Sequence, residues 1–156
     1  MLEPKPGLYK FNRALNYNID MEVVVHHLGD VKFEAIARGH RLVCDQPVEN
    51  HGGDSGMTPP ELLLSSRGTC AGYYAAEYLR TRGLPAEGLE VRVIGEKAAQ
   101  PTRLGSFRVE VTAPDLDPRH EAGILRAVKA CLIHNTLLHA PSVQLALETR
   151  VPAGIG

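Results

Sequence analysis

The stretch TPPELLLSSRGTCAGYYAAEYLRTRG, residues 58–83, predicts a long helix that organises the rest of the fold. Thr58 fits the N-cap, Pro59 the first helical position and Glu61 the third position of a capping box. This capping role explains the glutamate without any part in chemistry. Gly83 is a stop signal. Apolar side chains cover most faces between these points, which is typical of a helix that is buried nearly all round.

Strand patterns flank this helix on both sides. Residues 21–46 show the period-two alternation of strands, with turns at Gly29 and Gly39. The same alternation marks residues 89–93 and 107–111, and each of these strands has one polar face. A sheet with one wet face is typical of antiparallel pairing.

The remaining segments complete a layered α+β domain. Residues 97–105 are expected to be a loop or an open hairpin. Asp117 fits the N-cap of a second helix over residues 118–131, followed by a short helical piece over 132–140. Alternation over residues 143–147 predicts a closing strand. The expected order is βββ-α-ββ-α-β, with an antiparallel sheet packed on long helices.

The composition is that of one ordinary globular chain. Its 156 residues are enough for a single domain, which we expect to span residues 1–156 with residues 1–20 as an N-terminal arm. A net charge of −1 gives no reason to expect nucleic acid or an acidic membrane as a partner. The N-terminus lacks the apolar core of a secretory signal and no stretch approaches a membrane span, so we expect a cytoplasmic protein.

Three cysteines in a reducing compartment would be core residues, metal ligands or reactive thiols. Cys70 lies in the middle of the first helix and Cys131 at the end of the second. If the two helices pack together, one thiol would attack a substrate and the other would resolve it as a disulfide. The alternative is that each is a small buried apolar residue, as free cysteine usually is. Cys44, on a strand, is interpreted as structural.

Arg67 lies one turn before Cys70 on the same helical face. Its guanidinium would favour a thiolate at Cys70, or it would point to solvent or pair with a carboxylate, and spacing leaves these alternatives open. Cys70, Cys131 and either His134 or His139 could bind zinc, but no C-x-x-C or H-E-x-x-H spacing supports this. We therefore predict no metal and no other cofactor.

Two segments carry a resemblance to a known family. The run GGDSGMTPPELLLSSRGTC, residues 52–70, resembles the first-cysteine segment of the OsmC/Ohr family. The run AVKACLIHNTLLHAPSV, residues 127–143, resembles its second-cysteine segment. Together with the element order, the resemblance covers roughly residues 20–150. It implies an intertwined homodimer in which sheets wrap central helices and the cysteine pairs lie near the subunit interface.

The resemblance also implies an activity. The founding branches of the family are thiol-dependent peroxidases that prefer organic hydroperoxides and serve oxidative-stress defence. By carry-over, Cys70 would be the peroxidatic cysteine and would form a sulfenic acid. Cys131 would resolve it by closing a disulfide, which an external dithiol would then reduce. The protein is thus expected to be a hydroperoxide reductase.

The chain departs from those peroxidases in the residues that support the thiolate. Where they carry a glutamate, this chain has Pro60, and Glu61 is the next residue. They also use an arginine, for which Arg38 and Arg41 in the strand region are the candidates here, beside Arg67. An arginine–glutamate pair matters because it orients the peroxide and holds the thiolate.

Two other functions remain open at this stage. The departure at Pro60 favours a non-catalytic protein that binds a small apolar ligand in the cleft between the helices, where Tyr73 and Tyr74 would line it. A scaffold with inert cysteines is the third possibility. Slow thiol labelling in the folded state would indicate that scaffold.

Overall fold

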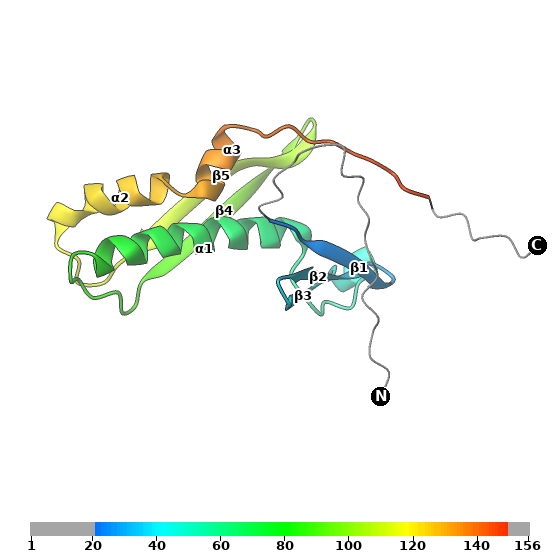
Figure 1. The fold of residues 1–156 in the computed structure, drawn as a ribbon, viewed down its shortest axis with the longest axis horizontal. Helices are drawn as coiled ribbons and strands as arrows, with labels where there is room; N and C mark the ends of the chain where they lie inside the picture. Colours follow the sequence, from blue (N-terminus) through cyan, green and yellow to red (C-terminus); the bar gives the residue numbers. More distant parts are fainter. Residues whose placement is uncertain (1–20, 150–156) are drawn as a thin grey trace, which may run out of the picture. The chain divides into compact units, whose positions relative to one another are not determined.

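The computed structural model describes residues 21–149, which fall into two compact units (Figure 1). Residues 21–58 form the first unit and residues 59–149 the second. Both contain antiparallel strands, and the second also contains three α-helices, so the predicted α+β class is confirmed. A single domain over 1–156 stays a prediction, and the predicted arm, residues 1–20, lies outside the described residues.

The first unit is a three-stranded antiparallel sheet with the strands in sequence order. The strands are β1 (Val24–Gly29), β2 (Lys32–Ala37) and β3 (His40–Cys44). The predicted turns are confirmed: Gly29 and Gly39 have φ of 123° and 84°, a region open to glycine and costly for other residues. A short 3-10 helix, Val48–Asn50, lies in the loop that follows β3.

The buried carboxylate of Asp45 organises this loop. It accepts hydrogen bonds from the backbone N–H groups of Gln46 at 2.8 Å, Gly53 at 3.1 Å and Ser55 at 3.0 Å. The Ser55 hydroxyl donates a fourth at 2.7 Å. A Cβ at Gly52 would lie 1.8 Å from the Gln46 carbonyl oxygen. The loop is therefore rich in glycine because its backbone passes close to itself around one carboxylate.

We expect Asp45 to make the first unit sensitive to acid. The hydroxyl and N–H of Ser55 hold the pKa of Asp45 well below its ordinary value of 3.8. Because the folded-state pKa is the lower one, the stability from this carboxylate is present above about pH 4 and is lost as the pH falls further. Asp45→Asn should unfold at lower urea concentration at pH 7 and lose less stability than wild type on acidification.

Urea midpoints at pH 7 and about pH 3 measure this effect. Asp54→Asn is the matched control, because Asp54 is an exposed residue of the same loop. Identical acid dependence of wild type and Asp45→Asn would contradict the prediction.

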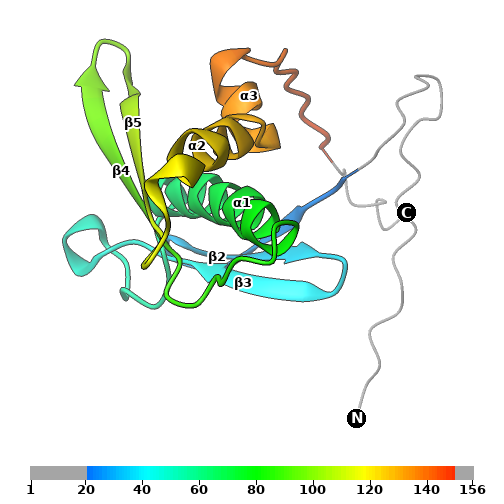
Figure 2. The ribbon, with the colours of Figure 1, turned by 90° about the vertical axis from the view of Figure 1, so that its left-hand side faces the viewer.

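The second unit packs helices against one face of a long hairpin. Figure 2 shows α1 and α2 side by side on the same side of β4 and β5. Its elements are α1 (Pro59–Arg80), β4 (Glu90–Ala99), β5 (Thr102–Thr112), a 3-10 turn (Pro118–His120), α2 (Glu121–Lys129) and α3 (Leu132–Leu138). No helix in residues 21–149 is long and apolar enough to cross a membrane.

Helix α1 begins and ends where local signals place its ends. Its first residue is Pro59, as predicted. At the other end Gly83 has φ of 64° and donates to the Arg80 carbonyl at 3.2 Å, while Leu84 donates to the Leu79 carbonyl at 3.0 Å. These two bonds form a Schellman motif, in which glycine takes the left-handed position.

The prediction that α1 is buried nearly all round is wrong for the described chain, because α2 and the hairpin cover only one side of it. On the uncovered side, Tyr73 is 65% exposed. The fully buried stripe consists of Arg67, Ala71, Ala75 and Leu79.

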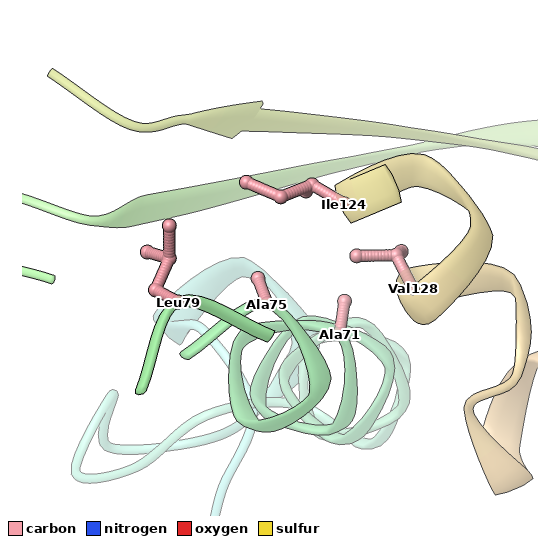
Figure 3. Close-up of a cluster of buried hydrophobic side chains, with 5 residues drawn as sticks. All are labelled: Ala71, Ala75, Leu79, Ile124 and Val128. Atoms are coloured by element: carbon pink, nitrogen blue, oxygen red, sulfur yellow. The ribbon is translucent and has the colours of Figure 1, made fainter. Parts of the chain in front are cut away.

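The hydrophobic core lies between this stripe and α2 (Figure 3). Ala71, Ala75 and Leu79 face Ile124 and Val128 of α2, and valines of the hairpin close the cluster. The alanines let the two helix backbones approach closely. Packing of α1 on α2 therefore decides where the end of α2, and the segment after it, lies relative to α1.

The β4–β5 hairpin is longer than the expected strands at 89–93 and 107–111. Pairing continues through Lys97–Leu104 and Ala99–Thr102, so residues 97–105 form the end of the hairpin. A bulge between Glu96 and Lys97 shifts the register. A bulge breaks the period-two pattern of side chains while the backbone ladder goes on. The apolar alternation alone therefore underestimates the length of the two strands.

Two predictions for the C-terminal part need correction. The helix expected over 118–131 is capped by Asp117, which accepts from Arg119 N–H at 3.0 Å, but it ends at Lys129. The closing strand at 143–147 is absent: residues 140–149 have no regular structure. Alternation indicates a segment that is able to pair, but a strand forms only beside a partner strand. Within residues 21–149, no strand pairs with residues 143–147.

Candidate disulfide site

Cys70 and Cys131 are joined as a disulfide in the second unit, with their Cα atoms 6.0 Å apart. Cys70 lies in the middle of α1, and Cys131 lies in the N-cap position of α3, directly after α2. That Cα separation lies within the usual range for disulfides. Cys131 is fully buried, whereas Cys70 is half-buried. Helix packing therefore brings together two thiols that the sequence only offers as candidates.

Arg67 reaches this disulfide from the preceding turn of α1, but its contact is with Cys131. One guanidinium nitrogen, Nη1, donates to the Cys131 Sγ at 3.8 Å. The other, Nη2, lies 3.1 Å from the Nδ1 of His134 on α3. The side chain of Arg67 is only 4% exposed. The alternative in which Arg67 points to solvent is wrong, and its sulfur partner is the cysteine distant in sequence.

His134 must accept the hydrogen bond from Arg67. A guanidinium has only donors, so the Nδ1 of His134 carries no proton and the neutral ring carries its hydrogen on Nε2. Burial lowers the pKa of His134, and the positive charges of Arg67 and Lys129 lower it further. Burial also lowers the pKa of Arg67. Arginine starts so far above neutral pH that the guanidinium stays charged. The site thus holds one fixed positive charge and one neutral imidazole.

A cavity of about 530 Å³ opens beside Arg67 and His134. Its walls are mainly apolar side chains of β5, α2 and α3, and Lys129 also borders it. This volume is within the range of small-molecule pockets. The predicted ligand cleft, lined by Tyr73 and Tyr74, was placed between the helices, whereas this cavity lies between β5 and the α2–α3 segment.

For the other candidate residues, the structure gives a position within the unit to which each belongs. Arg41 forms an ion pair with Glu34 across the β2–β3 pair at 2.6 Å, and Arg38 lies in the turn between these strands with φ of 50°. Both belong to the first unit. Glu61 is in the first turn of α1, about 13 Å from Cys70 along the helix axis at 1.5 Å per residue. Within the second unit, Arg67 is the candidate that reaches the cysteine pair.

The zinc alternative finds no geometric support in the described part of the chain. No group of three or more His, Cys, Asp or Glu side chains in residues 21–149 is placed to hold a metal ion. Cys44, the remaining cysteine, is unpaired and half-buried at the end of β3.

His134 is a site residue whose contact the sequence analysis missed. The sequence suggests His134 only as a zinc ligand, although it follows Cys131 by one helical turn. That spacing could have indicated a histidine on the same side of α3 as the cysteine. Its actual partner, Arg67, is on another helix, and only helix packing brings them together.

Sequence comparison identifies one family. A model of the family described as OsmC-like protein matches residues 52–146. This range contains both cysteines of the disulfide and both of the side chains that contact each other beside it, Arg67 and His134. The chain has no significant match among curated proteins.

Several solved structures share the fold. A protein from Psychrobacter arcticus, described as an osmotic stress induced and detoxification response protein, has a TM-score of 0.70 at 22% identity, over 78% of this chain and 91% of that one. An OsmC-like protein from Mycoplasma pneumoniae has a TM-score of 0.63 at 21% identity, over 80% and 91%. An organic hydroperoxide resistance protein OsmC from Legionella pneumophila has 0.55 at 14%, over 76% and 89%. At these identities the likeness shows the fold.

Proposed function

Because this chain belongs to the OsmC-like protein family, we propose that it is a thiol-dependent reductase of organic hydroperoxides. The observation that carries the proposal is the Cys70–Cys131 disulfide between α1 and the start of α3. Cys70 is the peroxidatic residue, because its half-buried position gives a peroxide better access than the fully buried Cys131 has. Cys131 is the resolving residue.

The reaction proceeds in two steps. The Cys70 thiolate attacks the peroxide oxygen, so that an S–O bond forms and the O–O bond breaks. The alkoxide leaves with a proton as the alcohol, and Cys70 becomes a sulfenic acid. The Cys131 thiolate then attacks the Cys70 sulfur, the S–S bond forms, and hydroxide leaves with a proton as water. An external dithiol reduces the disulfide by two thiol exchanges.

Two features support this reading over an inert disulfide. We predict that the protein is cytoplasmic. In the cytoplasm, persistent structural disulfides are rare, and the disulfides that do form are usually redox-active. One structural relative, from Legionella pneumophila, is described as an organic hydroperoxide resistance protein.

Pro60 replaces the glutamate of well-characterised peroxidases, so the thiolate must be supported by other residues.

The test is peroxide consumption by the reduced protein. One equivalent of cumene hydroperoxide should remove two free thiols per chain, and excess dithiothreitol should sustain turnover. Mass spectrometry should place the new disulfide between Cys70 and Cys131. Cys44→Ser is the matched control and should behave as wild type. Consumption no faster than that of the variant lacking both Cys70 and Cys131 would overturn the proposal.

A non-catalytic binding function is the second candidate, and the 530 Å³ cavity favours it. Its apolar walls and the nearby charges of Arg67 and Lys129 suit a small apolar molecule with an anionic end. Saturable binding of anilinonaphthalene sulfonate, weakened by Leu137→Asp in the cavity wall, together with absent peroxide turnover, would establish it. Fast turnover would instead assign the cavity to the substrate.

We also propose that the protein is a homodimer, as the family resemblance implies. Val143, Leu145 and Leu147 occupy alternate positions, separated by Gln144 and Ala146, and are 77%, 94% and 89% exposed within one chain. An unpaired segment with this alternation is a template for pairing with another strand. A strand added to a sheet edge of a second copy would cover these side chains.

Light scattering tests the dimer directly. Wild type should have a mass of about 34 kDa, twice the chain mass of 17.0 kDa. Replacing Val143, Leu145 and Leu147 by serine should shift the mass toward the monomer at micromolar concentration. The matched control replaces Gln144 and Glu148, the polar residues beside these positions, by serine. A wild-type mass of about 17 kDa would contradict the proposal.

A further inference from the structure

Arg67 is a buried cation whose partners are unusual. Removing a guanidinium from water is costly unless an opposite charge compensates it. No ion pair between Arg67 and a carboxylate is found in residues 21–149, and its contacts are the Cys131 Sγ and the neutral His134 ring. A disulfide sulfur is a weak acceptor. The oxidised protein therefore leaves this charge poorly compensated.

Reduction of the disulfide changes this balance. The Cys131 sulfur then becomes able to carry a negative charge at the position that Arg67 already contacts, 3.8 Å from Nη1. A charge-assisted contact in a buried site is stronger than the same contact in water. The charge is in place before reduction, so the guanidinium need not move far.

His134 holds the guanidinium in this orientation. The His134 Nδ1 lies 3.1 Å from Nη2 of the guanidinium, and this contact directs Nη1 to the Cys131 sulfur. The ring is neutral, because burial and the nearby charges of Arg67 and Lys129 lower the pKa of His134. The other wall of the site comes from β5, with apolar side chains including Phe107 and Val109. Arg67, which contacts the sulfur, is positive, and His134, which contacts Arg67, is neutral.

We propose that Arg67, held in place by His134, keeps Cys131 as a thiolate in the reduced protein and so speeds closure of the disulfide. Arg67 is a positioning residue for the resolving step, separate from the support of the peroxidatic Cys70. The catalytic part rests on the proposed function. The effect on the charge of Cys131 does not, because it requires no peroxide.

Two consequences follow for the redox cycle. Stabilising the thiolate stabilises the reduced protein, so the disulfide becomes easier for a dithiol to reduce. Without Arg67, the Cys70 sulfenic acid survives longer. A second hydroperoxide molecule then transfers an oxygen to the same sulfur, leaves as its alcohol, and converts Cys70 to the sulfinic acid.

The first experiment measures the thiolate of Cys131 alone. In the Cys44→Ser, Cys70→Ser background, absorbance near 240 nm against pH reports this thiolate. Adding Arg67→Met should lower the acid ionisation constant of Cys131 about tenfold or more, which corresponds to about 1.4 kcal/mol of lost interaction with the thiolate. Arg67→Lys should restore part of it, because the charge returns without the fork.

Further variants separate the charge of Arg67 from general disturbance of the fold. His134→Asn keeps an acceptor near the position of Nδ1 and should titrate like the parent, whereas His134→Leu should lower the thiolate fraction. Arg126→Met, which removes an exposed arginine from α2, is the matched control and should change nothing. An Arg67→Met ionisation constant for Cys131 within twofold of the parent value, with unchanged circular dichroism, would overturn the proposal.

The second experiment uses the full chain with all three cysteines and cumene hydroperoxide. Arg67→Met should convert a several times larger fraction of Cys70 to sulfinic acid per hydroperoxide molecule consumed than wild type does, as measured by peptide mass. Equal accumulation would contradict the role in resolution. If wild type consumes no peroxide, the proposed function fails, while the thiolate measurement still decides whether Arg67 charges Cys131.

Discussion

Cys70→Ser is expected to lower hydroperoxide consumption by on the order of a thousandfold or more, because it removes the sulfur that accepts the peroxide oxygen. Cys131→Ser should behave differently. It keeps the attacking sulfur, so each chain should consume one equivalent rapidly and then stop at the sulfenic acid. Stopped-flow measurement of the first turnover and dimedone labelling of the sulfenic acid distinguish the two variants.

The pattern across the variants also tests which thiol attacks first. Cys44→Ser should match wild type in both the first turnover and the steady state, because Cys44 is not part of the disulfide. If Cys131→Ser loses the first turnover while Cys70→Ser keeps it, the roles are reversed. Because Arg67 contacts Cys131, that outcome would make the arginine part of the attacking centre.

The sequence predicts those parts of the fold that depend on neighbouring residues. The start of α1 at Pro59 and its stop at Gly83 rest on chemistry within one turn of the helix. The turns at Gly29 and Gly39 rest on a conformation that few other residues adopt. The predictions for these positions are confirmed because no distant contact was needed to make them.

The failures arise where the partner of a segment is distant. Residues 143–147 alternate as a strand does, but alternation does not say whether a partner strand exists. The exposed faces of α1 were expected to be buried because they carry apolar side chains. Such side chains do not reveal which element, if any, covers them within one chain. Such faces are where a second copy would be expected, and this agrees with the proposed dimer.

The site shows the same limit more sharply. Helical spacing places Arg67 one turn before Cys70, and the sequence left open whether it contacts that cysteine, solvent or a carboxylate. In the fold the guanidinium turns across the helix interface to Cys131 and His134, both far along the chain. The residue types that mattered were identified, but their pairing depended on the packing of α1 against α2 and α3.

That packing leads to the largest stability effect expected in the second unit. Leu79→Ala should lower the free energy of unfolding by about 3 kcal/mol, because the side chain is 1% exposed and its loss leaves a cavity in a close-packed core. Leu79 also accepts the Schellman bond from Leu84, whose side chain packs against the same cluster. Urea unfolding at one fixed protein concentration measures the change, since dimerisation would make stability depend on concentration.

Leu132→Ala is the matched control, because that leucine is 57% exposed, and it should change stability by less than about 0.5 kcal/mol. Leu79 lies three turns, or about 18 Å along the helix, from Arg67 on the same buried stripe. Under conditions where the variant is folded, disulfide closure should therefore keep its wild-type rate. A loss of stability below about 1 kcal/mol would show that the surrounding core collapses into the space left by the Leu79 side chain. Slower disulfide closure would show that packing at Leu79 affects the geometry of the cysteine pair.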